Sequence, residues 1–274
     1  MNAGEGVRVG ITLPSFVRDV DEVLAVAVAA EAAGLDGIFV YDHLFRFAAD
    51  GSRRPALEVT TVLGALATAT SRILVGPLVA RASLRPPAIT ALAFTTTQRL
   101  TGGRLIGALG AGDHESQMEN ETFGLEFGSI DDRLAALTDA VRETRDQGFP
   151  VWVGGTHRRV RAIAAAEADG WNRWGGSAEV FREQSATACA AAVRAPFACS
   201  WGGLIVIGED DHRAREKAHR LGASPGTIVG GPDAVARACA AYVDAGAHWV
   251  IAGPVDSRDP ANADLLADVR ARLR

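Results

Sequence analysis

The residues best placed to do chemistry in this sequence are the adjacent pair Asp42 and His43. They follow the apolar run Gly37–Tyr41, which predicts a short buried strand. A carboxylate and an imidazole are costly to bury, so packing alone does not account for them at a strand end. An imidazole titrates near neutral pH and can therefore take up or release a proton during a reaction. The alternative is a hydrogen-bonded histidine that only orients Asp42.

The elements around this pair alternate between strand and helix along the whole chain. The predicted strands are Val7–Leu13, Gly37–Tyr41, Ile73–Val79, Arg104–Leu109, Val151–Val153, Trp171–Trp174, one within Phe197–Ile207, and Trp249–Ala252. The predicted helices are Val20–Ala33, Leu57–Thr70, Pro86–Leu100, Asp131–Asp146, Thr156–Ala168, Ala178–Val193, Glu209–Leu221, Pro232–Gly246 and Ala263–Leu273. Eight such units predict an α/β fold, a single (β/α)₈ TIM-barrel domain over residues 1–274, whose chemistry lies at the carboxyl ends of the strands.

Two longer connections follow predicted strands and therefore belong to the same rim. Arg46–Pro55 and Asp113–Ser129 are polar, and we expect both to be irregular loops. Trp174 and Trp201 lie near predicted strand ends and are candidates for lining a substrate pocket. Core packing is the alternative for both tryptophans.

Composition excludes several classes of function. The formal net charge of −5 provides no basic footprint for nucleic acid, and no apolar run reaches the roughly 20 residues that span a bilayer. Residues 1–6 lack a basic segment followed by an apolar one, so we expect no signal peptide and a cytoplasmic protein. Cys189, Cys199 and Cys239 lack CxxC spacing, which favours reduced thiols over a disulfide framework or a metal site. Lys217, the only lysine, is interpreted as a solvated surface charge, which argues against lysine-dependent aldolase chemistry.

Glycines follow two of the predicted strands. Gly154-Gly155-Thr156 precedes a helix, and the free N–H groups of a helix start suit a phosphate, although a simple turn explains the glycines equally well. Gly110-Ala111-Gly112 lacks the third glycine and the acidic residue of a dinucleotide fingerprint. We interpret Gly110 and Gly112 as positions where the backbone approaches a ring closely.

Short segments along nearly the whole chain resemble the bacterial luciferase-like flavin monooxygenases and their relatives that use the deazaflavin coenzyme F420. They occur in the family's order: Ala30–Leu44, Ser71–Gly76, Arg85–Ala88, Thr101–Leu105, Gly110–Gly112, Phe123–Gly124, Val153–Gly155, Ala168–Asn172, Gly230–Pro232 and Ala245–Ala247. No single segment is specific, but their order and spacing are.

The resemblance implies roles for individual residues. His43 matches the histidine that faces the flavin or deazaflavin ring, with Asp42 as its neighbour. Leu78 and Val79 match a bulge, cis in deazaflavin-dependent members, against which the ring lies. Gly154-Gly155-Thr156 matches the segment that holds the cofactor phosphate.

Asp113 matches an acidic position that is glutamate in F420-dependent sugar-phosphate dehydrogenases, and its shorter side chain departs from that pattern. A second departure is Arg145–Pro150, which replaces a longer segment that helps to cover the active site in the family. This shortening predicts a more open pocket, or a lid supplied by another loop or a partner subunit.

The resemblance implies an F420-dependent oxidoreductase that transfers hydride between the cofactor and a small organic substrate. Two alternatives stay open, an FMN-dependent monooxygenase and a non-catalytic flavin-binding barrel. A homodimer is expected from the resemblance alone.

Overall fold

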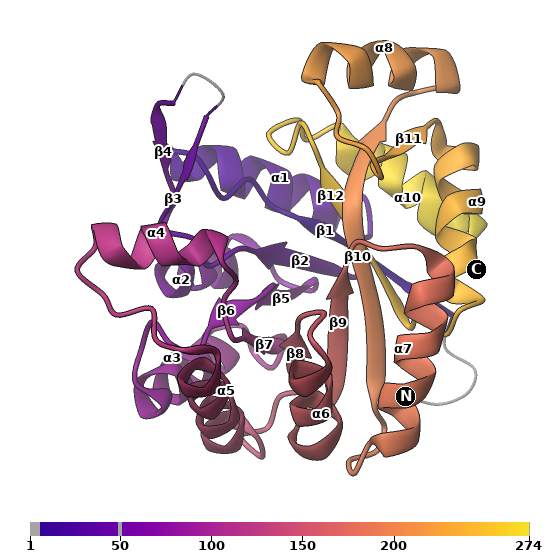
Figure 1. The fold of residues 1–274 in the computed structure, drawn as a ribbon. Coiled ribbons are helices and arrows are strands. Elements are labelled where there is room, and N and C mark those ends of the chain that lie inside the picture. The colour runs from indigo at the N-terminus through magenta and orange to yellow at the C-terminus, as the bar shows by residue number, and fades with distance from the viewer. Residues whose placement is uncertain (1–5, 49–50, 274) are drawn as a thin grey trace.

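A closed ring of parallel strands forms the centre of the molecule (Figure 1). The computed structural model describes residues 6–48 and 51–273. The ring consists of β1 (Arg8–Thr12), β2 (Gly37–Val40), β5 (Leu74–Pro77) with β6 (Ala80–Arg81), β7 (Gly107–Gly110), β8 (Val151–Gly154), β9 (Gly170–Trp174), β10 (Ala198–Ile207) and β12 (Trp249–Pro254). β5 pairs with β2, β6 pairs with β7, and a bridge between Val75 and Leu105 completes the closure. The predicted eight-stranded barrel is therefore confirmed, with β5 and β6 as two halves of its third strand.

Helices alternate with the strands and surround the barrel. They are α1 (Val20–Ala32), α2 (Val59–Ala69), α3 (Pro87–Leu100), α5 (Ile130–Thr144), α6 (Arg158–Glu167), α7 (Ala178–Ala191), α9 (Pro232–Val243) and α10 (Asn262–Arg272). A further helix, α8 (Asp211–Leu221), projects beyond the end of β10, where β11 (Ile228–Gly230) pairs with that strand. Residues 145–150 connect α5 to β8 directly.

Aromatic and aliphatic side chains together fill the barrel interior. Phe39, Trp152 and Trp249 pack against one another with ring centroids 5.6–6.2 Å apart, and each is at most 2% exposed. These residues point inward because alternate side chains of a strand face opposite sides. The packed interior leaves the carboxyl end of the barrel as the surface on which a site can be built.

Both connections expected to be irregular contain regular structure. Arg46–Pro55 lies largely in a hairpin of β3 (Phe45–Phe47) and β4 (Arg53–Pro55), although residues 49–50 lie outside the described part of the chain. Asp113–Ser129 contains helix α4 (Glu115–Thr122). Hydrophobic periodicity hides α4 because its buried residues are Ser116, Glu119 and Asn120, which are all polar.

The interpretation of Lys217 as a solvated surface charge is wrong. Its side chain is only 16% exposed, and its Nζ lies 2.5 Å from Asp256 Oδ2. The ammonium also donates to the Ile207 carbonyl and to Asn262 Oδ1. Lys217 thus ties α8 to the ends of β10 and β12, which is a structural role.

Residues 1–5, on which the expectation of no signal peptide largely rests, lie outside the described residues. Among the residues that are described, none of the helices is both long and apolar enough to cross a membrane.

Candidate active site

His43 lies just beyond the carboxyl end of β2, where the sequence predicts a functional residue. Its side chain is 27% exposed. The ring centroid lies 5.5 Å from that of Phe16 and 6.4 Å from that of Tyr41. The imidazole is therefore packed on aromatic neighbours while part of it remains accessible to solvent.

Glu119 of α4 holds the imidazole, and the sequence analysis missed this residue. Glu119 Oε1 lies 2.6 Å from His43 Nδ1, and Oε2 accepts hydrogen bonds from the Leu44 N–H (2.6 Å) and Arg81 Nη2 (3.2 Å). Burial raises the pKa of Glu119, but these hydrogen bonds and the nearby charge of Arg81 outweigh it, so the pKa is lowered. An ionised Glu119 accepts a hydrogen bond from the Nδ1–H group of His43, which leaves Nε2 of His43 as the nitrogen for a reacting group.

Asp42 anchors the loop that carries His43. Its side chain is 2% exposed and accepts from the Arg81 N–H (2.8 Å) and from Arg85 Nη1 and Nη2 (2.8 and 3.1 Å). Arg85 also donates to Glu58 Oε1 at 2.6 Å. This arrangement saturates the carboxylate and agrees with an anchoring role for Asp42 rather than proton transfer.

The junction between β5 and β6 carries the second predicted feature. The Leu78–Val79 peptide bond is cis, as the resemblance implies. A Cβ at Gly110 would lie 2.4 Å from Val79 Cγ2, and one at Gly154 would lie 2.5 Å from Val79 Cγ1. Both glycines therefore make room for the side chain of Val79. Contact of Gly110 and Gly112 with a cofactor ring stays a prediction.

The two predicted pocket tryptophans lie on opposite sides of the barrel wall. Trp174 points into the barrel, where a Cβ at Gly202 or Gly253 would lie 2.6 or 2.7 Å from its indole, and it packs edge-on against Tyr41 at 5.8 Å. Trp201 is 2% exposed and stacks on Tyr242 of α9 at 3.8 Å, outside the barrel. The structure thus brings Trp174 to the barrel mouth and does not place Trp201 there.

Asp113 is exposed and its carboxylate is already engaged. Its Oδ1 accepts from the Ser116 N–H (3.0 Å) and from Ser116 Oγ (2.8 Å) at the start of α4. These bonds give Asp113 a structural part in forming the helix that carries Glu119. A catalytic role for Asp113 stays a prediction.

The segment predicted to hold a phosphate lies between β8 and α6. Gly155 has φ +142°, and a Cβ there would lie 3.1 Å from Val160, so its backbone requires glycine. α6 begins with Arg158 and Arg159 and has no acidic residue in its first turn. Arg159 is already paired with Asp131, whose Oδ1 lies 2.5 Å from Arg159 Nη1, so it needs no further anion. The fit of this helix start to a phosphate therefore rests on Arg158 and on the N–H groups at the start of the helix.

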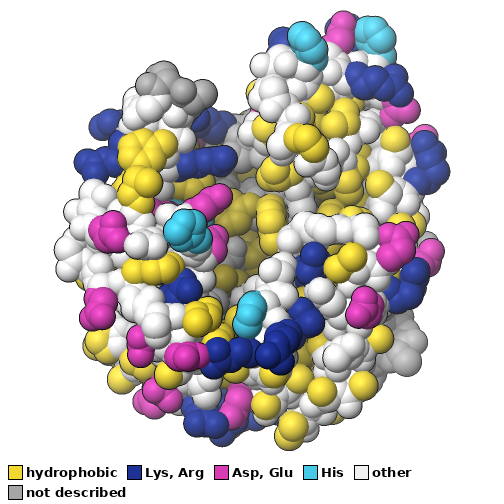
Figure 2. All heavy atoms as spheres, viewed as in Figure 1, with side chains coloured by type: hydrophobic (Ala, Val, Ile, Leu, Met, Phe, Trp, Pro, Cys, Tyr) yellow, Lys and Arg dark blue, Asp and Glu magenta, His cyan; other side chains and the backbone are white. Residues whose placement is uncertain are grey.

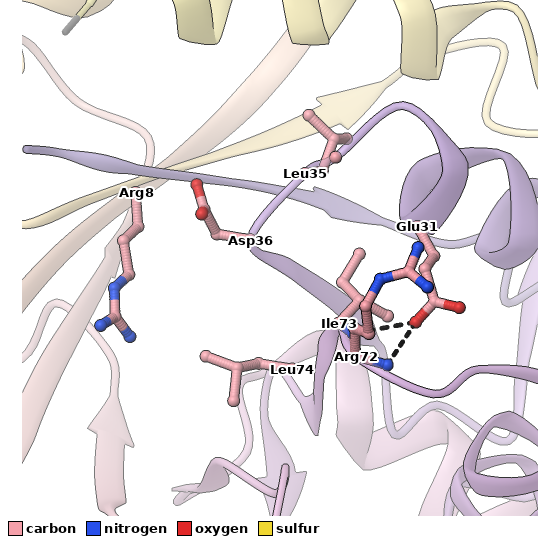
Figure 3. A pocket seen from close by; sticks show the side chains of 8 residues that line it. Arg8, Glu31, Leu35, Asp36, Arg72, Ile73 and Leu74 are labelled. Atoms are coloured by element: carbon pink, nitrogen blue, oxygen red, sulfur yellow. Dashed lines mark hydrogen bonds between the residues drawn. The ribbon is translucent and has the colours of Figure 1, made fainter.

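The face in Figure 2 is hollowed near its centre, with hydrophobic side chains inside the hollow and charged ones around it. A separate cavity of about 420 Å³ lies at the opposite end of the barrel (Figure 3). It is lined by Arg8, Glu31, Asp36 and Arg72 near the amino ends of β1, β2 and β5.

Known proteins with similar sequences or structures point to one family. Over 143 residues the chain is 36% identical to an F420-dependent glucose-6-phosphate dehydrogenase of Beutenbergia cavernae, a match that covers 51% of this chain but only 41% of that relative. An F420-dependent secondary alcohol dehydrogenase, solved with an F420-acetone adduct, superposes with a TM-score of 0.83 at 16% identity, covering 98% of this chain and 100% of the other. The EDTA monooxygenase of Chelativorans sp. BNC1 superposes with a TM-score of 0.80 at 13% identity, covering 98% and 94%. At these identities the two structural likenesses concern the fold.

The family model of the luciferase-like monooxygenases matches residues 6–147, just over half of the chain. This match includes β2 and the His43 that follows it, the Leu78–Val79 junction and helix α4. The chain therefore belongs to the luciferase-like monooxygenase family.

Proposed function

We propose that this protein is an F420-dependent oxidoreductase that acts on a small organic substrate. The observation that carries the proposal is the partly exposed imidazole of His43, held through Nδ1 by Glu119 at the mouth of the barrel. The names of the relatives support F420 as the cofactor. When bound, F420 donates or accepts the hydride in such a reaction.

The proposed role of His43 is to move the proton that accompanies the hydride. Its Nε2 would give a proton to a substrate carbonyl oxygen during reduction, or take one from a hydroxyl during oxidation. Glu119 would hold the ring in place through Nδ1. Asp42 and Arg85 would fix the loop that carries the histidine. Asp113 remains a candidate second acid because it lies on the same rim.

The cofactor would lie between the Leu78–Val79 junction and the start of α6. Gly154, Gly155 and Thr156 would hold its phosphate, with the charge of Arg158 beside it. Val79 would present an apolar surface to the ring.

The substrate pocket would have apolar walls formed by Tyr41 and Trp174. Burial raises the pKa of Tyr41 to about 12, and its hydroxyl donates to Thr12 Oγ1 at 3.2 Å. Tyr41 therefore stays neutral at physiological pH and would not exchange a proton with the substrate. These walls suit a small uncharged group next to His43.

An FMN-dependent monooxygenase is the second candidate, because the chain belongs to the luciferase-like monooxygenase family. Titration of the purified protein with F420 and with FMN, monitored by fluorescence, separates the candidates. We expect saturable F420 binding and much weaker FMN binding. Tight FMN binding without F420 binding would contradict the proposal, and binding without turnover across a panel of small alcohols and ketones would favour a non-catalytic barrel.

We also propose a homodimer that works in the cytoplasm. Ile89, Leu92 and Leu100 of α3 are 52–63% exposed, which is unusual for large apolar side chains on one helix. Burial against a second copy would remove this surface from water. Size-exclusion chromatography with light scattering should give twice the mass of one chain, and a monomeric mass at micromolar concentration would exclude this assembly.

A further inference from the structure

Two cysteines with no motif in the sequence come together in the structure. Cys189 lies in the last turn of α7, and Cys199 is the second residue of β10. Their Sγ atoms are 3.2 Å apart, and both thiols are free. A disulfide requires about 2.05 Å between the sulfurs, so an approach of roughly 1 Å would join them.

The two thiols differ in the way that a redox-reactive pair requires. Cys189 is exposed, whereas Cys199 is 0% exposed. The hydrogen bond from Cys199 lowers the pKa of Cys189 to about 7, while the contact with Cys189 together with burial raises that of Cys199. The thiolate, which is the nucleophile, therefore forms on the sulfur that solvent can reach.

The backbone around the pair determines which cysteine moves. The Cys199 N–H donates to His248 Nδ1 at 3.0 Å, and the Cys199 carbonyl accepts from the His248 N–H at 2.8 Å. Cys199 is thus fixed in the barrel wall. Cys189 lies at a helix end, where the backbone adjusts at low cost. Cys189 is therefore the residue that moves when the two sulfurs approach each other.

We propose that Cys189 and Cys199 form a reversible disulfide when the protein meets a peroxide, which makes this pair a redox modification site. The Cys189 thiol releases its proton, its thiolate attacks one peroxide oxygen, and the O–O bond breaks. A sulfenic acid forms, and the leaving hydroxide takes up the released proton to become water. The Cys199 sulfur then attacks the sulfenic sulfur, the S–O bond breaks, and a second water leaves. The two thiols lose two electrons in total, and the peroxide is reduced to water.

The site is separate from the proposed active site. Cys199 lies near the amino end of β10, whereas His43 follows the carboxyl end of β2. Cofactor binding at the barrel mouth and oxidation of the pair are therefore independent observables, and the failure of one does not imply the failure of the other.

The test is oxidation of the reduced full-length protein with hydrogen peroxide, followed by intact-mass spectrometry and peptide mapping. We expect a loss of two hydrogen masses, a single Cys189–Cys199 cross-link and full recovery with dithiothreitol. Cys239 is a matched internal control because it is buried in α9, where burial raises its pKa to about 12. Cys239→Ser should oxidise like the wild type, and Cys189→Ser, an exposed change that leaves the core intact, should form no cross-link.

Cys199→Ala should stop the reaction at the sulfenic acid on Cys189, which dimedone traps. The proposal is overturned if wild-type protein gains oxygen atoms without a cross-link, if the cross-link involves Cys239, or if Cys189→Ser is oxidised to the same extent.

Discussion

The two ends of the barrel both carry charged networks, but the networks are built differently. At the amino end, Glu31 accepts hydrogen bonds from the N–H groups of Ser71, Arg72 and Ile73. At the same end Asp36 accepts two bonds from Arg270. These charged side chains bind backbone groups or one another.

At the carboxyl end the network ends in a group that can react. Arg85 holds Asp42, Arg81 holds both Asp42 and Glu119, and Glu119 holds His43. The buried members support one imidazole whose ring is partly open to solvent. The comparison teaches that a charged network alone does not mark a functional site, whereas a network that orients an accessible titratable group does.

Replacement of His43 should have the largest effect. His43→Ala should reduce turnover with F420 by about 100- to 10,000-fold, because the proton partner of the hydride is lost. Cofactor affinity should stay near the wild-type value, as measured by fluorescence titration. His212→Ala on α8 is the matched control, because His212 is 77% exposed. Unchanged turnover in His43→Ala would remove this residue from the mechanism.

Replacement of Asp42 should weaken the carboxyl-end network itself. Asp42→Asn leaves Arg85 without its buried charge partner and should lower the free energy of unfolding by about 3 kcal/mol in urea titrations. Asp233→Asn breaks a pair with Arg272 in which the aspartate is 72% exposed, and should cost less than about 1 kcal/mol. Equal effects of the two changes would contradict the anchoring role of Asp42.

Replacement of Glu119 tests the link between the network and the imidazole. Glu119→Gln should lower kcat on the order of 10-fold, with little change in KM, and should displace the pH profile of kcat/KM. A purely structural role would change stability but leave the pH profile in place. Glu121→Gln, on the exposed side of the same helix, should behave like the wild type.

Replacement of Glu31 should have the smallest effect, and only on stability. Burial raises the pKa of Glu31, but its three backbone hydrogen bonds outweigh this and lower it from 4.5 to about 2. The carboxylate therefore contributes stability above pH 4.5, and this contribution is lost as the pH falls toward about 2. Wild type and Glu31→Gln should differ in unfolding midpoint at neutral pH and converge in acid, with turnover unchanged. A constant difference across this range would show that charge is not the cause.

The sequence predicted the barrel because its strands and helices carry strong apolar patterns bounded by glycine and proline. It predicted His43 because a polar residue after a buried strand conflicts with packing. It could not predict Glu119, since α4 buries a polar face and shows no apolar period. It also could not show why Gly110 and Gly154 are glycines, because the side chain that fills their space, Val79, belongs to the distant junction between β5 and β6.

The tryptophans and Lys217 illustrate a second limit. Whether Trp174 or Trp201 points into or out of the barrel depends on the register of its strand. That register is set by pairing with neighbouring strands. Lys217 looks like a surface residue in a charged helix, but Asp256 and Asn262, which bury it, follow it by about forty residues. The local sequence pattern therefore identified the helices and strands and one reactive residue, His43. The residues that each side chain contacts are determined by long-range packing.

Hydrogen–deuterium exchange with and without F420 tests the central claim most directly, because it compares the two ends of the barrel in one experiment and needs no substrate. We expect protection in peptides that contain residues 41–45, 78–82 and 154–160, and none around Glu31, Asp36 and Arg72 beside the amino-end cavity. Protection confined to the amino end, or no protection at saturating F420, would contradict the assignment of the active site to His43 and the barrel mouth.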